Sequence, residues 1–261
     1  MNLKNIWLMF IVPMAAIVPF KIYSYFANIP FIESPTFVIM STVILAALML
    51  CICFAKTNIR NLDLNKNIPL GIAGVLVTTS FFWCITAYAT DTARYDFEWQ
   101  PIMLSAMAVV SFIAFLLVAL TFFMGKNMFR SASFFIYCPV IWFALAMVLL
   151  LSIYNNNPDI YEILLKSLLA LFLIYHTQIF STSSNANIVK LLYLFGIPAI
   201  VTACIRALPV LIETVKNHAI SSQVSVATAA LEFTLAIYIL LVLVEAQVQS
   251  NKALGKIKAN A

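Results

Sequence analysis

The chain has 261 residues, of which 64% are apolar and only 10% are charged. Soluble domains are about 45–50% apolar and about 25% charged, so this composition excludes an ordinary soluble protein. The formal charge of +5 comes from single lysines and arginines scattered between apolar runs, which does not fit a nucleic-acid-binding patch. We therefore expect one polytopic membrane domain, with the lipid bilayer as a partner and no nucleic acid bound.

Apolar runs of about 20 residues follow one another almost without a pause, and a run of that length crosses a bilayer as a helix. We expect an all-α polytopic bundle of about eight membrane-spanning helices. It would form a single domain at 1-246, followed by a short basic cytoplasmic tail at 247-261. The predicted helices cover residues 6–27, 36–55, 68–90, 101–124, 133–154, 160–181, 188–212 and 223–245.

The basic residues predict the orientation of these helices. Lysine and arginine accumulate in cytoplasmic loops of membrane proteins, and here they alternate from loop to loop. We therefore predict that both termini lie inside. The first helix also has features of a secretory signal, with Lys4 before its apolar run. We expect it to be retained, because the basic residues fall consistently on one side only if the chain has eight spans. With this orientation, ten of the fifteen basic residues fall inside: Lys4, Lys56, Arg60, Lys66, Lys126, Arg130, Lys190, Lys252, Lys256 and Lys258.

The sequence lacks the motifs of several kinds of catalytic and binding chemistry. It contains no Gly-rich phosphate loop, no His-Glu-x-x-His motif and no Gly-x-Ser-x-Gly elbow. The five cysteines all fall inside apolar runs, without the spacing of a metal site or a disulfide framework. We therefore expect no catalytic residues, no metal and no cofactor, and we predict that the protein is not an enzyme.

Two full charges occur where the bilayer core should be, Arg206 in the seventh predicted helix and Glu232 in the eighth. A charge at that depth is unfavourable by about 2.5–3.5 kcal/mol on insertion scales, so it usually faces a partner or a wet cavity. Arg206 would lie roughly 10 Å below the outer end of its helix, and Glu232 roughly 16 Å below Ser221. An ion pair between the two helices is therefore feasible, and structural pairing without any further role is an alternative.

Polar side chains accompany these two charges. Ser225, Thr228 and Glu232 form a stripe on the eighth helix, and Thr202 lies one turn deeper than Arg206 on the seventh. His176 lies in the inner half of the sixth helix, where a hydrogen-bonded packing role and a proton-relay role are both open.

Two more cations, Lys21 and Lys166, are predicted at a comparable depth. Each can snorkel to the interface, and Glu162 precedes Lys166 at the spacing of a local helix pair. If both lysines instead join Arg206 against Glu232, positive charge is in surplus. Such a site would be an electropositive vestibule open to the outside, suited to an anionic or zwitterionic small molecule.

These patterns favour a small transporter or solute-binding membrane protein. The alternative is a non-catalytic membrane subunit, or an anchoring partner of a larger complex, in which the charges serve assembly with another membrane protein or a second copy. A third possibility is an intramembrane enzyme. A proton relay through Glu232 and His176 stays open as an alternative to a packing role for His176. The residues predicted to bind substrate are Arg206, Glu232, Lys21, Lys166, Thr202, Ser225 and Thr228.

Three segments of the second half carry a resemblance to known sequences: Pro-Val-Ile-Trp at 139–142, the region 175–180, and Arg-Ala-Leu-Pro at 206–209. In these segments the chain resembles multi-pass membrane proteins of Gram-positive anaerobes. That group is similar in size and hydropathy and carries no assigned function. The resemblance therefore implies only a location, the bacterial cytoplasmic membrane, which is a plasma membrane.

Overall fold

The computed structural model describes residues 3–26, 35–55, 59, 62–94, 99–131, 133–153, 160–180, 187–217 and 223–259. Lys56, Arg60 and Ser221 lie outside the described residues. Within the described ranges the chain is all-helical, with no strand. The α-helices are α1 (Leu3–Phe26), α2 (Pro35–Cys53), α3 (Ile68–Arg94), α4 (Trp99–Met124), α5 (Cys138–Ile153), α6 (Ile160–Thr177), α7 (Ile188–Asn217) and α8 (Gln223–Ala259).

The all-α prediction is confirmed, and each predicted helix has a counterpart. Six helices in the described ranges are long and apolar enough to cross a membrane, as expected of a multi-pass membrane protein. In α1 and α2 the apolar stretches found there are shorter, Met14–Tyr23 and Met40–Cys53. Large apolar side chains such as Ile72, Phe82 and Trp83 stay exposed on α3, as a surface facing lipid requires. A count of eight crossings stays a prediction.

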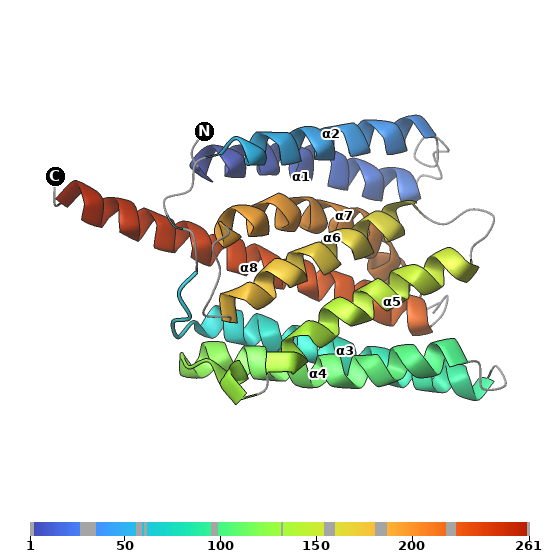
Figure 1. The fold of residues 1–261 in the computed structure, drawn as a ribbon. Coiled ribbons are helices and arrows are strands. Elements are labelled where there is room, and N and C mark those ends of the chain that lie inside the picture. The colour runs from blue at the N-terminus through green and yellow to red at the C-terminus, as the bar shows by residue number, and fades with distance from the viewer. Residues whose placement is uncertain are drawn as a thin grey trace.

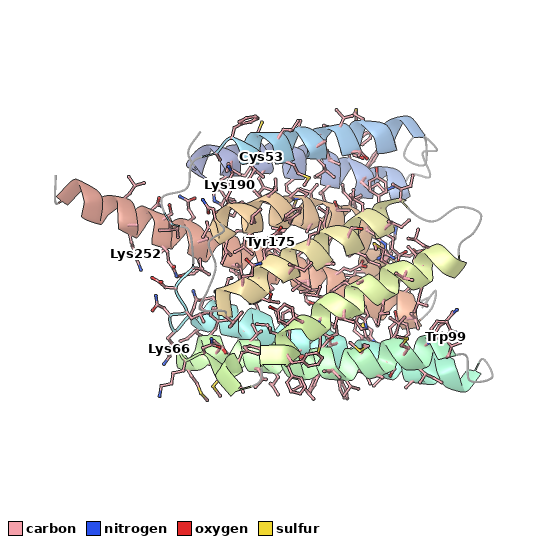
Figure 2. All side chains as sticks on the ribbon, viewed as in Figure 1. Cys53, Lys66, Trp99, Tyr175, Lys190 and Lys252 are labelled. Atoms are coloured by element: carbon pink, nitrogen blue, oxygen red, sulfur yellow. The ribbon has the colours of Figure 1, made fainter. Side chains whose placement is uncertain are left out.

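Successive helices run in opposite directions along one bundle (Figure 1). The pair α1 and α2 lies on one side, the pair α3 and α4 on the other, and α6, α7 and α8 run between them. Both termini lie at the same end, and α8 continues past the bundle there. Figure 2 places Lys66, Lys190 and Lys252 at this end and Trp99 at the opposite end. These three lysines lie at the end that the predicted orientation places inside, and the side of the membrane that this end faces stays a prediction.

Local signals explain where several helices begin and end. Asn67 caps α3, since its side-chain Oδ1 accepts a hydrogen bond of 3.1 Å from the Leu70 amide. Asn187 does the same for α7, with 3.1 Å to the Lys190 amide. Helix α4 ends before Gly125, whose φ of 68° is the left-handed conformation that commonly closes a helix.

Close approach of backbones holds α3 against α4. A Cβ added at Gly74 would lie 3.0 Å from the Cβ of Ala119 and 3.1 Å from its Cα. Helices in a bilayer associate largely through such van der Waals packing, because lipid tails are as apolar as the side chains. Glycine at this position therefore allows the two helices to form a tight pair at one edge of the bundle.

Of the six candidate membrane spans, the one in α7 is the most buried, and α7 continues through two prolines, Pro198 and Pro209. Proline lacks the amide hydrogen, so the Ile205 carbonyl loses its usual partner four residues on. Ala199, Ala203 and Ala207 share one face and are fully buried, which lets neighbouring helices come close. The helix reaches Asn217, five residues beyond its predicted end.

Candidate functional site

Three helices bring four charged side chains to one place inside the bundle. Glu162 and Lys166 come from the first turns of α6, Arg206 from α7 and Glu232 from α8. With a rise of 1.5 Å per residue, Lys166, Arg206 and Glu232 lie roughly 9–16 Å from the nearest end of their helices. Those ends, where α6 and α8 begin and α7 ends, lie together opposite the chain termini (Figure 1).

The four side chains form a closed ring of ion pairs, which we call the ion ring. Lys166 Nζ lies 2.6 Å from Glu162 Oε1 and 3.3 Å from Glu232 Oε1. Arg206 Nη2 lies 2.8 Å from Glu162 Oε2, and its Nη1 contacts Glu232 Oε2. Each cation therefore contacts both carboxylates, and signs alternate around the ring. Two positive and two negative charges make it neutral.

The ion ring has a buried edge and a partly exposed edge. The side chains of Lys166 and Glu232 are only 4% and 2% exposed, whereas Glu162 and Arg206 are each 18% exposed. A buried ion pair is tolerated when additional partners offset the lost hydration, and here each charge has two partners of opposite sign. We call the pair Glu162 and Arg206 the outer edge, and Lys166 and Glu232 the inner edge.

Other helices surround the ion ring. Cys84 and Tyr88 on α3 lie close enough to its charges to interact with them electrostatically. Tyr161, the residue before Glu162, shares a hydrogen bond of 2.7 Å with Ser41 of α2. The Nζ of Lys21 on α1 lies 5.8 Å from the centre of the Tyr161 ring, a cation–π contact. Helices α1 and α2 thus contact α6 at Tyr161, and we call this contact the rim of the site.

Of the predicted site residues, the structure brings Arg206, Glu232 and Lys166 into direct contact. Arg206 and Glu232 meet at one level, although we expected Glu232 to lie deeper. The reason is the helix bounds: α7 continues to Asn217, which places Arg206 deeper below its end than predicted. Lys21 turns toward α6 at the rim, beside Tyr161.

The hydroxyl groups of the two predicted threonines donate hydrogen bonds to backbone carbonyls of their own helices. Thr202 is fully buried and its Oγ1 donates to the Pro198 carbonyl at 2.8 Å. Thr228 is buried and donates to the carbonyls of Val224 and Ser225 at 2.9 and 3.0 Å. Ser225 is half-buried near the start of α8. These bonds satisfy backbone carbonyls, so the stripe does not direct its threonine protons into a groove.

The expected surplus of positive charge is absent from the ion ring, because Glu162 supplies a second carboxylate. From the sequence, Glu162 was assigned only a local pair with Lys166, and its bond to Arg206 was missed. The charge count itself contained the missing signal. Three deep cations against one carboxylate call for a second acid, and Glu162 is the nearest one on the helix that carries Lys166.

His176 is not brought to the ion ring. It lies ten residues after Lys166 on α6, roughly 15 Å further along the helix. Its Nε2 shares a hydrogen bond of 2.7 Å with the Tyr238 hydroxyl, and its ring stacks on Phe172 at 5.9 Å. A relay from Glu232 to His176 therefore finds no direct connection, and the arrangement is that of a buried packing residue.

A cavity of about 490 Å³ lies among α1, α7 and α8, with an apolar lining that includes Phe10, Met14, Cys204 and Phe233. Cys204 precedes Arg206 by two residues, which places the two side chains about 200° apart around α7. The cavity and the ion ring therefore lie on different sides of this helix, and the cavity is not the polar groove expected from the sequence.

Among the described residues, no group of three or more His, Cys, Asp or Glu side chains has a metal-binding arrangement. The partly exposed pair Glu162 and Arg206 can exchange its ionic partners with an ion that reaches the outer edge.

Comparison with protein-family models, with curated proteins and with solved structures finds no match to this chain, so the candidate site rests on its own geometry.

Proposed function

We propose that the protein is a small transporter or solute-binding membrane protein, and that the ion ring binds an anionic or zwitterionic solute. One observation carries this proposal. A buried set of charges has a single edge, Glu162 and Arg206, that is 18% exposed, while the rest is closed off. Charged groups inside a membrane are expensive, and they commonly mark a substrate or ion pathway.

In this proposal Arg206 is the anion clamp, because the planar guanidinium binds a carboxylate through two parallel hydrogen bonds. Glu232 is its counter-ion, and Lys166 keeps Glu232 in place when Arg206 turns to a solute. Opening the outer edge separates α6 from α7. Pro209 lies three residues from Arg206, and the missing backbone hydrogen bond there gives α7 a point at which to bend.

Thiol labelling on whole cells tests whether the site opens outward. Cysteine is placed singly at Thr202, Thr228 and Ser225 in a chain whose five native cysteines are replaced, and a membrane-impermeant reagent is added outside. Thr202 and Thr228 are buried in the closed structure, so their labelling reports opening between helices. We expect labelling at all three positions, slowest at Thr202.

The matched control is cysteine at Thr86, which lies on an exposed face of α3 in the half of that helix nearer the outer end. A lipid-facing thiol does not ionise and should not react. Protection at both Thr202 and Thr228 would contradict the proposal whatever the labelling at Ser225, which is half-buried in the closed structure. Labelling at Thr86 as fast as at Thr228 would show that the reagent reports depth alone.

A non-catalytic membrane subunit is the second candidate, and the closure of the ion ring favours it. All four charges satisfy one another inside the chain, as a purely structural clamp between α6, α7 and α8 would require. In this case the helices stay closed, and the two threonine positions remain protected while the protein is folded and inserted. The labelling experiment therefore separates the two candidates.

A further inference from the structure

At the outer edge of the ion ring, two opposite charges lie side by side. Arg206 Nη2 and Glu162 Oε2 are 2.8 Å apart, and both side chains are exposed to the same extent, 18%. A solute that reaches this edge meets a guanidinium and a carboxylate at the same time. The edge therefore differs from the electropositive vestibule that the sequence predicted.

We infer that the solute of this site is a small zwitterion of the amino-acid type, with a carboxylate and an ammonium group on neighbouring atoms. This inference rests on the proposed function and deepens it. The solute carboxylate binds Arg206, its ammonium group binds Glu162, and the bond between those two residues opens to admit it.

Charge balance is the argument for a zwitterion. The solute replaces the contact between Arg206 and Glu162 with two new ion pairs, so the number of pairs rises from four to five and the net charge stays at zero. A solute with a carboxylate alone separates Arg206 from Glu162 and leaves that acid with Lys166 as its only partner in the ring. Excess charge in a site this deep is strongly unfavourable.

The inner edge supplies the rigidity that recognition needs. Lys166 and Glu232 are almost fully buried and contact each other at 3.3 Å, so they remain paired while the outer edge opens. Lys166 also holds Glu162 at 2.6 Å, on the same helix. The carboxylate that faces the ammonium group is therefore fixed in position before the solute arrives, which lowers the ordering cost of binding.

Lys21 is a described cation outside the ion ring, and it contacts α6, so it could favour an anion instead. Its Nζ lies over the ring of Tyr161, the residue before Glu162, at 5.8 Å from the ring centre. The test must therefore separate the effect of Lys21 from that of Glu162, and Lys21→Met is included for this purpose.

The experiment measures thermal stabilisation of the purified full chain by defined probes. The probes are the twenty amino acids, with propionate and ethylamine as single-charge counterparts of alanine and with the corresponding pairs for any other amino acid that binds. We expect at least one amino acid to raise the unfolding midpoint in a saturable way. Its carboxylate-only and amine-only counterparts should have no effect at the same concentration.

The variant Glu162→Gln removes the partner of the ammonium group. Loss of one charge-assisted hydrogen bond should weaken zwitterion binding by about tenfold or more and should admit carboxylates that the native protein rejects. As a control, Glu213→Gln makes the same chemical change on α7 outside the ion ring. The affinity of this variant for the zwitterion should stay within about twofold of that of the native protein. Lys21→Met should preserve the preference for zwitterions. If Glu162→Gln does not fold, Glu162→Asp retains the charge and should weaken binding without admitting anions.

Stabilisation by propionate equal to that by alanine would overturn the zwitterion inference and leave solute binding at the site intact. Loss of zwitterion preference in Lys21→Met would overturn it as well, because the selectivity would then come from the rim. Absence of any effect from all amino acids would also overturn it. Thiol labelling at Thr202 and Thr228 decides the proposed function separately, so the two failures are distinguishable.

Discussion

Exchanging Arg206 and Glu232 is the sharpest test of the ion ring. In an isolated ion pair the double change Arg206→Glu with Glu232→Arg preserves the attraction and should be tolerated. In a ring it should not be, because each exchanged group has a second neighbour. The carboxylate introduced at 206 faces Glu162, and the guanidinium introduced at 232 faces Lys166.

The native distances give the size of the effect. The contacts that change sign are 2.8 Å long between Arg206 and Glu162 and 3.3 Å long between Lys166 and Glu232. Two unit charges 4 Å apart interact by about 4 kcal/mol at an effective dielectric constant of 20. Two new repulsions therefore sum to about 8 kcal/mol, which is comparable with the whole stability of a typical domain, about 5–15 kcal/mol. The exchanged protein should not accumulate in a folded form.

The assay is the folded fraction of a fluorescent fusion, read by size-exclusion chromatography in mild detergent. Adding Glu162→Gln and Lys166→Met to the exchanged chain removes both repulsions and should restore the monodisperse peak. The same two changes in the native chain serve as the control, because they leave Arg206 paired with Glu232. Native-like folding of the simple exchange would refute the ring, as would failure of the fourfold variant when its control folds.

Three further predictions concern stability, measured as the free energy of unfolding in a sodium dodecyl sulfate titration. Asn67→Ala removes the cap of α3 and also the hydrogen bond of 2.7 Å that the Asn67 side-chain amide donates to the Glu245 carboxylate of α8. This change should cost about 0.5–2 kcal/mol, and an unchanged free energy would contradict the prediction. Gly74→Ala should cost about 1–3 kcal/mol because the new Cβ meets the backbone of Ala119. Ala119→Gly in the same chain should recover part of that loss, and no recovery would show that the contact is not the cause. Tyr238→Phe leaves the buried His176 nitrogen without its partner at 2.7 Å and should cost about 1–3 kcal/mol; a more stable variant would mean that the pair is not formed.

Hydropathy was enough to predict the helices, because a bilayer forces every buried backbone group to bond within its own segment. The largest error was at α8, predicted to end at 245 and observed to continue to Ala259. The signal there changes from apolar to polar at Gln247, and a hydropathy window ends where the apolar run ends. Helical structure outside the membrane depends instead on local propensity, and this segment contains Ala, Lys, Gln and Leu, which favour helices.

The candidate site was predicted in part. Intramembrane charge identified Arg206 and Glu232, because an ionised group at that depth is costly unless it faces an opposite charge or water. The role of Glu162 was missed because the local spacing to Lys166 already accounted for it, although a carboxylate has two oxygens and can bind two cations. Helix orientation about its own axis decides which partner the second oxygen finds, and sequence spacing alone does not fix this for helices that are far apart in the chain.

The alternation of charges also sets an order for biogenesis. Helix α6 brings Glu162 and Lys166 into the bilayer together, so their charges offset each other at insertion. Helix α7 then adds Arg206, and the count is balanced only when α8 delivers Glu232. Among the charges of the ion ring, a chain that ends between α7 and α8 therefore carries a surplus cation within the membrane. Helix α8 thus completes the charge balance of the ion ring.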